Sequence, residues 1–194
     1  MLRHSRILAM LGMAISLGAA APLRAMDGPA RVAGVDFYLS VDLSERRLYV
    51  MRDGEQAASY PVAIGQPSHP TPTGRYRINH LVWNPRWVPP DARWARNRRP
   101  REPGDPRNPM GRVKLFFKDP DLYIHGTHEE DSLGSAESHG CLRMRNADVV
   151  ALARAVMRNG GSPRDPSWFR RVIGRVTSTR EVGLSDPVLL EIHR

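Results

Sequence analysis

The sequence predicts a mainly β protein, a β-sandwich or barrel-like sheet with one or two docked helices. Six short segments before position 126 carry alternating or β-branched apolar residues, and only two later segments have helical spacing. Turns rich in Gly, Pro, Asn and Asp separate the short segments, as in sandwiches and barrels. We therefore expect antiparallel strands with few helices around one core.

The expected strands are separated by recognisable turns. They cover residues 35–41, 47–51, 57–64, 75–79, 113–117 and 122–125, and a closing strand covers 187–193. Residues 43–46 form the first turn, and Asp53-Gly54 is typical of a hairpin. The sixth segment ends on His125, so we expect this histidine at the end of a strand.

Two helices are expected in the last third of the chain. The first has Asn146 as a favourable N-cap and Asp148 in its first turn. Its apolar face is formed by Val149, Val150, Leu152, Ala153 and Val156. Asn159-Gly160-Gly161 ends it, and a second, short helix is expected over residues 166–172.

The N-terminus has the pattern of a secretory signal peptide. A short basic stretch with Arg3 and Arg6 precedes the apolar residues 7–21, and a small residue, Ala25, follows. The apolar run is shorter than the roughly 20 residues that span a membrane. We expect residues 1–25 to be removed, with a retained anchor as the alternative, and residues 35–194 to form one catalytic domain. Only an uncleaved signal segment would contact a membrane.

Charge restricts the class of partner. The chain has a net charge of +9, which falls to +6 without the three arginines of residues 1–25. Such a charge favours an anionic partner. No zinc-finger spacing or basic helical stripe is present in the sequence, so nucleic acid is not expected. For a chain exported to the periplasm, an acidic cell-wall polymer is the better partner.

The chain contains one cysteine, Cys141, with Gly140 before it and His125 sixteen positions upstream. A single cysteine cannot form an internal disulfide, and a free thiol in an oxidising compartment is a liability unless it is used. One interpretation is an inert, buried cysteine. The other is a nucleophile whose thiolate forms when an imidazole takes the proton. The flanking Ser138-His139-Gly140 favours the nucleophile.

Several motifs in this order resemble the catalytic domain of the L,D-transpeptidases, the YkuD family. They are His125-Gly126-Thr127, a spacer, and Ser138-His139-Gly140-Cys141-Leu142-Arg143. Further similar pieces are residues 62–65, 70–74, 84–90 and 108–111. The resemblance covers residues 35–193.

The resemblance implies a two-step acyl transfer on peptidoglycan stem peptides. Cys141 would attack the carbonyl between a diamino acid and the terminal D-alanine of a tetrapeptide donor, forming a thioester. The amine of another stem's diamino acid would then attack, giving a 3→3 cross-link. The same site, with water as acceptor, would make an L,D-carboxypeptidase or an amidase. A transferase that attaches a lipoprotein to peptidoglycan and a wall-binding module without catalysis are further alternatives.

The resemblance also assigns roles around Cys141. His125 would be the general base and acid, held by a backbone carbonyl near Gly126. Backbone N–H groups of Gly140 and Cys141 would stabilise the oxyanion. Arg143 would bind a stem-peptide carboxylate, because its fork suits that group.

Three neighbouring side chains leave alternatives open. His139 could serve as the base, but a structural or substrate-orienting role suits it better. Ser138 is expected to fix the loop by hydrogen bonding. Tyr123 is expected to pack or to line the site.

A metal site is the competing chemistry. His125, His128, His139 and Cys141 could supply nitrogen and sulfur ligands. Neither a cysteine pair nor a His-x₃-His pattern is present in the sequence, and a metal would occupy the thiolate that acyl transfer needs. We expect no metal and no cofactor.

Residues 84–109 have the most unusual composition, and we call them the arginine loop. They contain seven prolines and seven arginines, with Trp87 and Trp94 interleaved. A solvated, semi-rigid loop is one interpretation. A lid with aromatics and arginines over a substrate cleft is the other, because loops of this length often cover active sites.

Overall fold

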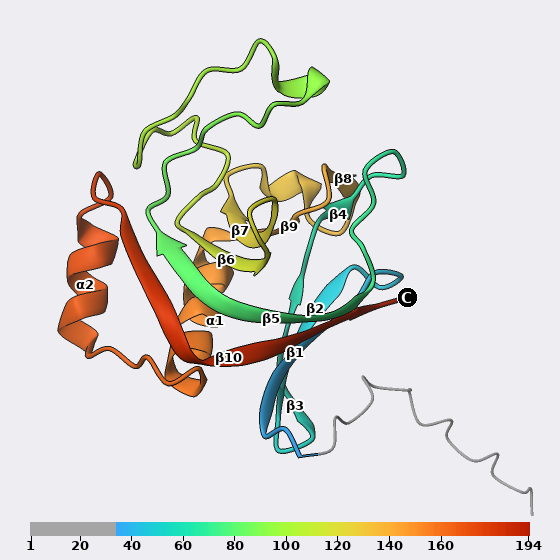
Figure 1. Ribbon diagram of the computed structural model, residues 1–194, viewed down its shortest axis with the longest axis vertical. Helices are drawn as coiled ribbons and strands as arrows, with labels where there is room; N and C mark the ends of the chain where they lie inside the picture. The colour runs from blue at the N-terminus through green and yellow to red at the C-terminus, as the bar shows by residue number, and fades with distance from the viewer. Residues whose placement is uncertain (1–33) are drawn as a thin grey trace, which may run out of the picture.

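The computed structural model describes residues 34–194 (Figure 1). One curved sheet of eight strands, a small sheet of two strands and two α-helices make up the fold. The strands are β1 (Phe37–Asp42), β2 (Arg47–Arg52), β3 (Glu55–Pro61), β4 (Ile64–Gly65), β5 (Gly74–Trp83), β6 (Val113–Lys118), β7 (Leu122–Thr127), β8 (Ala136–Ser138), β9 (Leu142–Arg145) and β10 (Arg180–His193). The helices are α1 (Asn146–Asn159) and α2 (Pro166–Gly174), with two 3-10 turns, η1 (Arg93–Ala95) and η2 (Glu130–Ser132).

The large sheet has the order β3-β2-β1-β10-β5-β6-β7-β9, and β4 pairs with β8 in the small sheet. The prediction of a mainly β, barrel-like fold is confirmed. Most strand pairs are antiparallel, as expected, but β1 pairs with β10, β7 with β9 and β4 with β8 in parallel, which the sequence did not predict. The chain reaches β9 from β7 through η2 and β8, a connection long enough to reverse direction twice.

One backbone pair nearly closes the sheet into a barrel. Ala63 follows β3 at one edge, and Arg143 lies in β9 at the other edge. The N–H of each residue donates to the carbonyl of the other, both at 3.0 Å. This closure satisfies backbone groups that an open edge would leave exposed, and it fixes the strand that follows Cys141.

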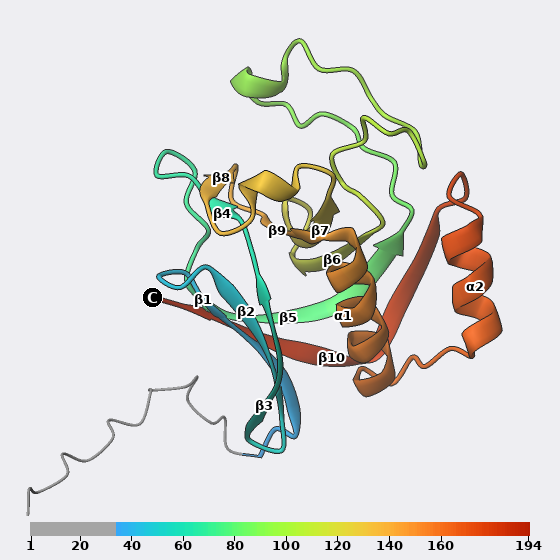
Figure 2. The ribbon, with the colours of Figure 1, turned by 180° about the vertical axis from the view of Figure 1, so that it is seen from behind.

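The core lies in the hollow of the curved sheet, where α1 packs against β6, β7, β9 and β10 (Figure 2). The helix buries five side chains there: Val149, Leu152, Ala153, Val156 and Met157. Burying a side chain the size of leucine contributes about 1.5–3 kcal/mol. This face therefore holds β7 and β9, the two strands that carry the motif residues, in a fixed register.

Most expected strands are present, with shifted ends. The segment 57–64 is divided between β3 and β4, because the chain leaves the β2 edge after Pro61. The closing strand begins at Arg180 rather than 187, and its pairing with β5 is interrupted between Gly183 and Val188. Sequence patterns missed β8 and β9, which are too short to show an alternation.

The expected capping role of Asn146 was wrong. Helix α1 begins at Asn146 itself, and Arg145 is its N-cap residue, without a side-chain hydrogen bond. The Asn146 amide instead accepts from Arg112 N–H at 3.0 Å and donates to the Thr127 carbonyl at 3.0 Å. It thereby joins the helix to the segments before β6 and at the end of β7.

The expected end of the first helix and the presence of a second helix from Pro166 are confirmed. Helix α1 ends at Asn159, and Gly160 is its C-cap residue. Helix α2 has Asp165 as N-cap, whose carboxylate accepts from Ser167 N–H and Trp168 N–H, and Pro166 occupies the first turn. Among residues 34–194, no helix is long and apolar enough to span a membrane. The expected signal peptide lies outside the described residues.

We predict that Asn146→Ala lowers the free energy of unfolding by about 1–3 kcal/mol, because it leaves two backbone groups without partners. Urea denaturation measures the change. Asn159→Ala is the control, since its amide bonds only the carbonyl of Ala155 within the same helix. Equal, small effects of the two substitutions would contradict the bridging role of Asn146.

Candidate active site

Strand register gathers the motif residues on one face of the sheet. Lys114 of β6 pairs with His125 of β7, and His125 pairs with Arg143 of β9. Tyr123 lies two positions before His125, and Cys141 two before Arg143, so both point to the same face. The residues between them, such as Ile124 and Leu142, are fully buried in the core. The alternation of the strands therefore separates the site from the core.

The loop that carries Cys141 is held by hydrogen bonds to its own backbone. Ser138 Oγ donates to the Cys141 carbonyl at 2.6 Å and accepts from Gly140 N–H at 3.1 Å. Thr71 Oγ1 donates to the Gly140 carbonyl at 3.0 Å. Gly140 has a φ of 107°, a backbone conformation that residues with a Cβ rarely adopt. Ser138 thus fixes the loop, as the sequence suggested.

The thiol of Cys141 is half-buried and protonated at neutral pH. Its Sγ donates to the Asp121 carbonyl at 3.4 Å. Burial raises the pKa of the thiol to about 11. The Tyr123 N–H and hydroxyl, together with the charges of Lys114 and Arg143, act in the opposite direction by stabilising the thiolate.

His125 is buried, and its tautomer is fixed. Its Nδ1 lies 2.7 Å from the Gly126 carbonyl, which can only accept, so Nδ1 carries the proton. Nε2 therefore holds the lone pair that can take a proton. Burial lowers the pKa of His125 to about 3, and the charges of Arg143 and Lys114 lower it further. The expected hydrogen bond between His125 and a backbone carbonyl near Gly126 is therefore present.

At neutral pH the site therefore holds a neutral thiol and a neutral imidazole. Within residues 34–194, no hydrogen bond joins Cys141 to either His125 or His139. A nucleophilic Cys141 would have to leave the Asp121 carbonyl and pass its proton on as it attacks. An arrangement of this kind limits oxidation of the free sulfur, because the thiolate is the reactive form.

Lys114 belongs to the site although sequence analysis missed it. Its Nζ lies 4.3 Å from the centre of the Tyr123 ring and 5.8 Å from that of Phe116. Burial lowers the pKa of Lys114 to about 8, and the charge of Cys141 opposes this shift. In the sequence, Lys114 occupies an ordinary position in an alternating strand. Only the pairing of Lys114 with His125 in the sheet shows that it belongs to the site.

Tyr123 and Arg143 both have partners. The Tyr123 ring lies edge-on to His125 with centres 5.5 Å apart, and burial followed by the charge of Cys141 raises the pKa of Tyr123. Arg143 Nη1 contacts Glu129 Oε2 at 3.1 Å, so the guanidinium is already paired with a carboxylate. Glu129 was not expected from the sequence. A substrate carboxylate would have to share Arg143 with it.

His139 contacts the arginine loop rather than the sulfur. The indole of Trp94 stacks on its ring with centres 3.9 Å apart and 18° between the planes. His69 lies edge-on at 5.0 Å. Burial lowers the pKa of His139, followed by the charges of His69 and Arg143. The arginine loop thus reaches over the Cys141 loop, which favours the lid over the solvated loop.

Hydrogen bonds hold the two ends of the arginine loop in place. Asn84 N–H donates to the Arg112 carbonyl at 2.8 Å, and Asn108 Nδ2 donates to the Pro85 carbonyl at 2.8 Å. Trp87 and Arg101 pair through their backbones, with hydrogen bonds of 2.9 Å in both directions. These contacts fix the two ends of the loop relative to each other and to the chain before β6.

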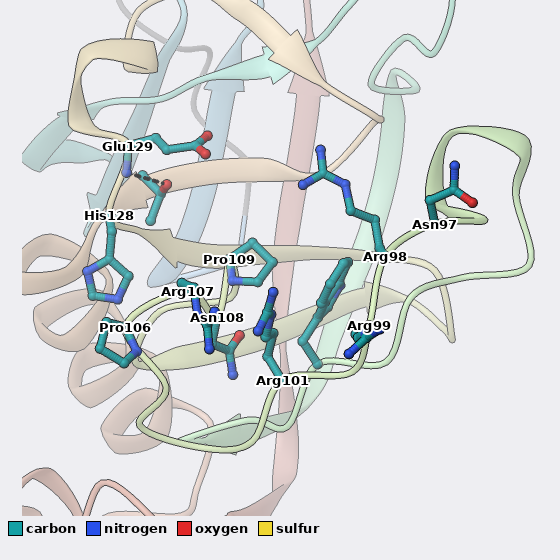
Figure 3. Close-up of a pocket in the computed structure, with 12 residues that line it drawn as sticks. Asn97, Arg98, Arg99, Arg101, Pro106, Arg107, Asn108, Pro109, His128 and Glu129 are labelled. Carbon is teal, nitrogen blue, oxygen red and sulfur yellow. Dashed lines mark hydrogen bonds between the residues drawn. The ribbon is translucent and has the colours of Figure 1, made fainter.

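A cavity of about 810 Å³ lies between this loop and the residues that follow β7 (Figure 3). One wall contains Thr127, His128 and Glu129. The opposite wall comes from the arginine loop, and its lining residues are Trp87, Asn97, Arg98, Arg99, Arg101, Pro106, Arg107, Asn108 and Pro109. The lining is strongly basic.

The candidate metal ligands are not gathered into one site among residues 34–194. Within the described part of the chain, no group of three or more His, Cys, Asp or Glu side chains could hold an ion. His128 is exposed at the cavity, whereas His125 is buried and His139 stacks on Trp94. The side chains that could have supplied ligands are thus separated.

Comparison with known proteins gives the family. The family model YkuD, the L,D-transpeptidase catalytic domain, matches residues 36–181. The chain belongs to this family. Cys141, His125 and the residues around them all fall within the matched range.

Individual relatives agree with this assignment. YqjB of Bacillus subtilis is 32% identical over 126 residues, covering 62% of this chain and 66% of that protein. The Probable L,D-transpeptidase YbiS of Escherichia coli K12 is 33% identical over 125 residues, covering 60% of this chain and 40% of that one. The match thus spans less than two thirds of the length of these relatives.

A solved structure shares the fold. The L,D-transpeptidase from Mycobacterium smegmatis aligns with a TM-score of 0.51 at 16% sequence identity, over 86% of this chain and 69% of that one. At this identity, the likeness supports the fold of the sheet and helices.

We predict that Lys114→Met slows alkylation of Cys141 by iodoacetamide about three- to tenfold at pH 7. The ammonium stabilises the thiolate, and one pKa unit corresponds to tenfold in thiolate. Because the pKa of Lys114 is lowered to about 8, its charge is present below that pH and lost above it. The rate difference should therefore shrink above pH 9.

Intact mass measures this alkylation cleanly, since Cys141 is the only cysteine in the chain. Lys114→Arg is the matched control, because it keeps a cation at all accessible pH values. Superimposable pH profiles of wild type and Lys114→Met would show that the lysine does not act on the sulfur.

Proposed function

We propose that this protein is a peptidoglycan L,D-transpeptidase that forms 3→3 cross-links through a thioester on Cys141. The proposal is supported by one observation: in a chain of this family, β7 and β9 pair side by side, so that the loop ending in Cys141 lies next to the strand that carries His125. The donor is a stem tetrapeptide, and the acceptor is the amine of a diamino acid in another stem.

Acylation begins at the carbonyl carbon between the diamino acid and the terminal D-alanine. Cys141 Sγ forms a bond to this carbon, and the thiol proton passes to His125 Nε2. The carbon–nitrogen bond then breaks, and the D-alanine nitrogen leaves with the proton from His125. A thioester and neutral imidazole remain. The tautomer set by the Gly126 carbonyl suits His125 to both transfers.

The oxyanion needs backbone donors near Sγ. Gly140 N–H faces Ser138 Oγ in the resting loop, so it becomes available only if the oxyanion replaces that hydroxyl. Cys141 N–H is the second candidate donor. Losing one such donor in other enzymes reduces the rate about 10²–10³-fold.

Deacylation decides between transfer and hydrolysis. In transfer, the acceptor amine attacks the thioester carbon, its proton goes to His125, and Cys141 leaves as the thiol after taking that proton. In hydrolysis, water takes the place of the amine and a tripeptide is released. The basic cavity at the end of β7 provides room for a second peptide, which favours transfer.

The place of action is part of this proposal. The basic and apolar pattern of residues 1–25 supports export to the periplasm, where stem peptides are found. A net charge of +6 after its removal supports contact with an acidic wall polymer.

We predict that incubation with disaccharide tetrapeptides yields dimers and free D-alanine, and that Cys141→Ala abolishes both. Mass spectrometry of the products distinguishes the outcomes. Tripeptide monomers as the only product would assign an L,D-carboxypeptidase, and no turnover with an intact fold would leave a binding module.

A matched pair of variants distinguishes the roles of His125 and His139. His125→Gln should reduce acylation by at least about 10²-fold, as expected for a lost general base. His139→Gln should retain the acylation rate within about tenfold, because its ring packs against Trp94. An active His125 variant alongside an inactive His139 variant would reverse the assignment of the base.

A further inference from the structure

Lys114 is a cation without an acidic partner on the face of the sheet that carries the candidate site. Within residues 34–194 its ammonium makes no ion pair and no hydrogen bond, and it lies over the aromatic rings of Tyr123 and Phe116. The residue is only partly exposed. A charge withdrawn from water in this way is costly unless an opposite charge comes close to it. The lysine is therefore available to bind an anion.

The type of side chain is unusual for this chain. The sequence contains 29 lysines and arginines, and only two of them, Lys114 and Lys118, are lysines. Lys118 is exposed at the end of β6, whereas Lys114 lies within β6 opposite His125. An ammonium is a compact charge, while a guanidinium is a broad, planar group. A narrow site for one carboxylate close to a reacting atom suits the ammonium better.

The ammonium of Lys114 and the sulfur of Cys141 act on each other. Burial raises the pKa of the thiol and lowers that of the lysine, and the charge of each group opposes the shift of the other. An electrostatic effect of this kind falls off with distance, so the two groups are neighbours. The thiol is protonated at neutral pH, and it therefore does not itself supply the negative charge that the lysine lacks.

The second cation that acts on the Cys141 thiol is already paired. Arg143 Nη1 lies 3.1 Å from Glu129 Oε2, so an incoming carboxylate would have to compete with Glu129 for the guanidinium. Lys114 has no such competitor among residues 34–194. Of these two cations, Lys114 is the one whose charge is open to a ligand.

We propose that Lys114 binds the C-terminal carboxylate of the donor peptide and is a specificity-determining residue for acylation. The inference rests on the proposed acyl transfer and specifies how its donor is recognised. In a peptide that ends one residue after the scissile bond, only the amide nitrogen and one carbon separate this carboxylate from the scissile carbonyl carbon. An ammonium beside Sγ that holds the carboxylate therefore keeps the carbonyl carbon close to Cys141. The hydrogen bond is charge-assisted on both sides, which makes it stronger than a neutral one.

The first test compares two small alkylating agents, iodoacetate and iodoacetamide, of which only iodoacetate carries a carboxylate. Both react with the single thiol of the chain, so intact mass follows both reactions. The ratio of the two rate constants does not depend on the fraction of thiolate, because both agents attack the same thiolate. Lys114→Met should lower the iodoacetate-to-iodoacetamide ratio about tenfold, whereas Lys114→Arg, which keeps a cation, should retain most of it.

Lys118→Met is the matched control, because it removes the only other lysine from the same strand at an exposed position. It should leave the ratio unchanged. Equal ratios in wild type and Lys114→Met would overturn the proposal. An equal fall in Lys118→Met would also overturn it, since the effect would then follow from net charge alone.

The second test begins with the wild-type protein, so it does not depend on the folding of a variant. The probes are a disaccharide tetrapeptide that ends in D-alanine and the same compound that ends in D-alanine amide. Wild type should form the acyl-enzyme about tenfold more slowly from the amide, because the amide cannot pair with the ammonium. Lys114→Met should use both donors at equal rates. Equal rates in wild type would contradict recognition of the carboxylate.

The two tests distinguish this inference from the proposed function. A wild-type protein that forms no acyl-enzyme from either tetrapeptide would refute the proposed function, and the alkylation ratio would still decide whether Lys114 binds a carboxylate beside the sulfur. A wild-type protein that is acylated equally fast by both tetrapeptides would refute only the role of Lys114.

Discussion

The burial of one thiol and one imidazole on the same face of the sheet is the constraint on which the site depends. Burial favours the neutral form of each group, so Cys141 rests as a thiol and His125 as a neutral ring. Lys114, Arg143 and the Tyr123 hydroxyl partly offset the effect of burial on the thiol pKa, because all three stabilise a developing thiolate. The thiol is thereby held in its protonated, unreactive form, and its Sγ donates to the Asp121 carbonyl.

That constraint is maintained by the way the sheet closes. The backbone pair between Ala63 and Arg143 holds β9 against the chain that follows β3, while Asn146 holds β9 and α1 against β7. Gly126 is required at this junction, because a Cβ there would lie 2.2 Å from Asn146 Oδ1. The glycine of the His-Gly-Thr motif thus serves packing as well as the carbonyl that orients His125.

The sequence allowed the fold class, most strands and both helices to be predicted, because alternation and helix stops are local features. It could not show Lys114 or Glu129, which are ordinary residues until strand register and loop path bring them to the site. It also misassigned Asn146, since a favourable cap residue can bond to distant strands instead. The surroundings of the thiol could not be predicted either, because they depend on how the chain at Asp121 packs against the Cys141 loop.

Trapping the acyl-enzyme tests the central claim most directly. Brief incubation with a stem tetrapeptide, followed by acid quenching and intact-mass analysis, should show the mass of the protein plus the tripeptide acyl group, with the added group mapped to Cys141. The adduct should be absent in Cys141→Ala and should decay when an acceptor amine is supplied. A wild-type protein that releases D-alanine without ever carrying an acyl group on sulfur would contradict the account.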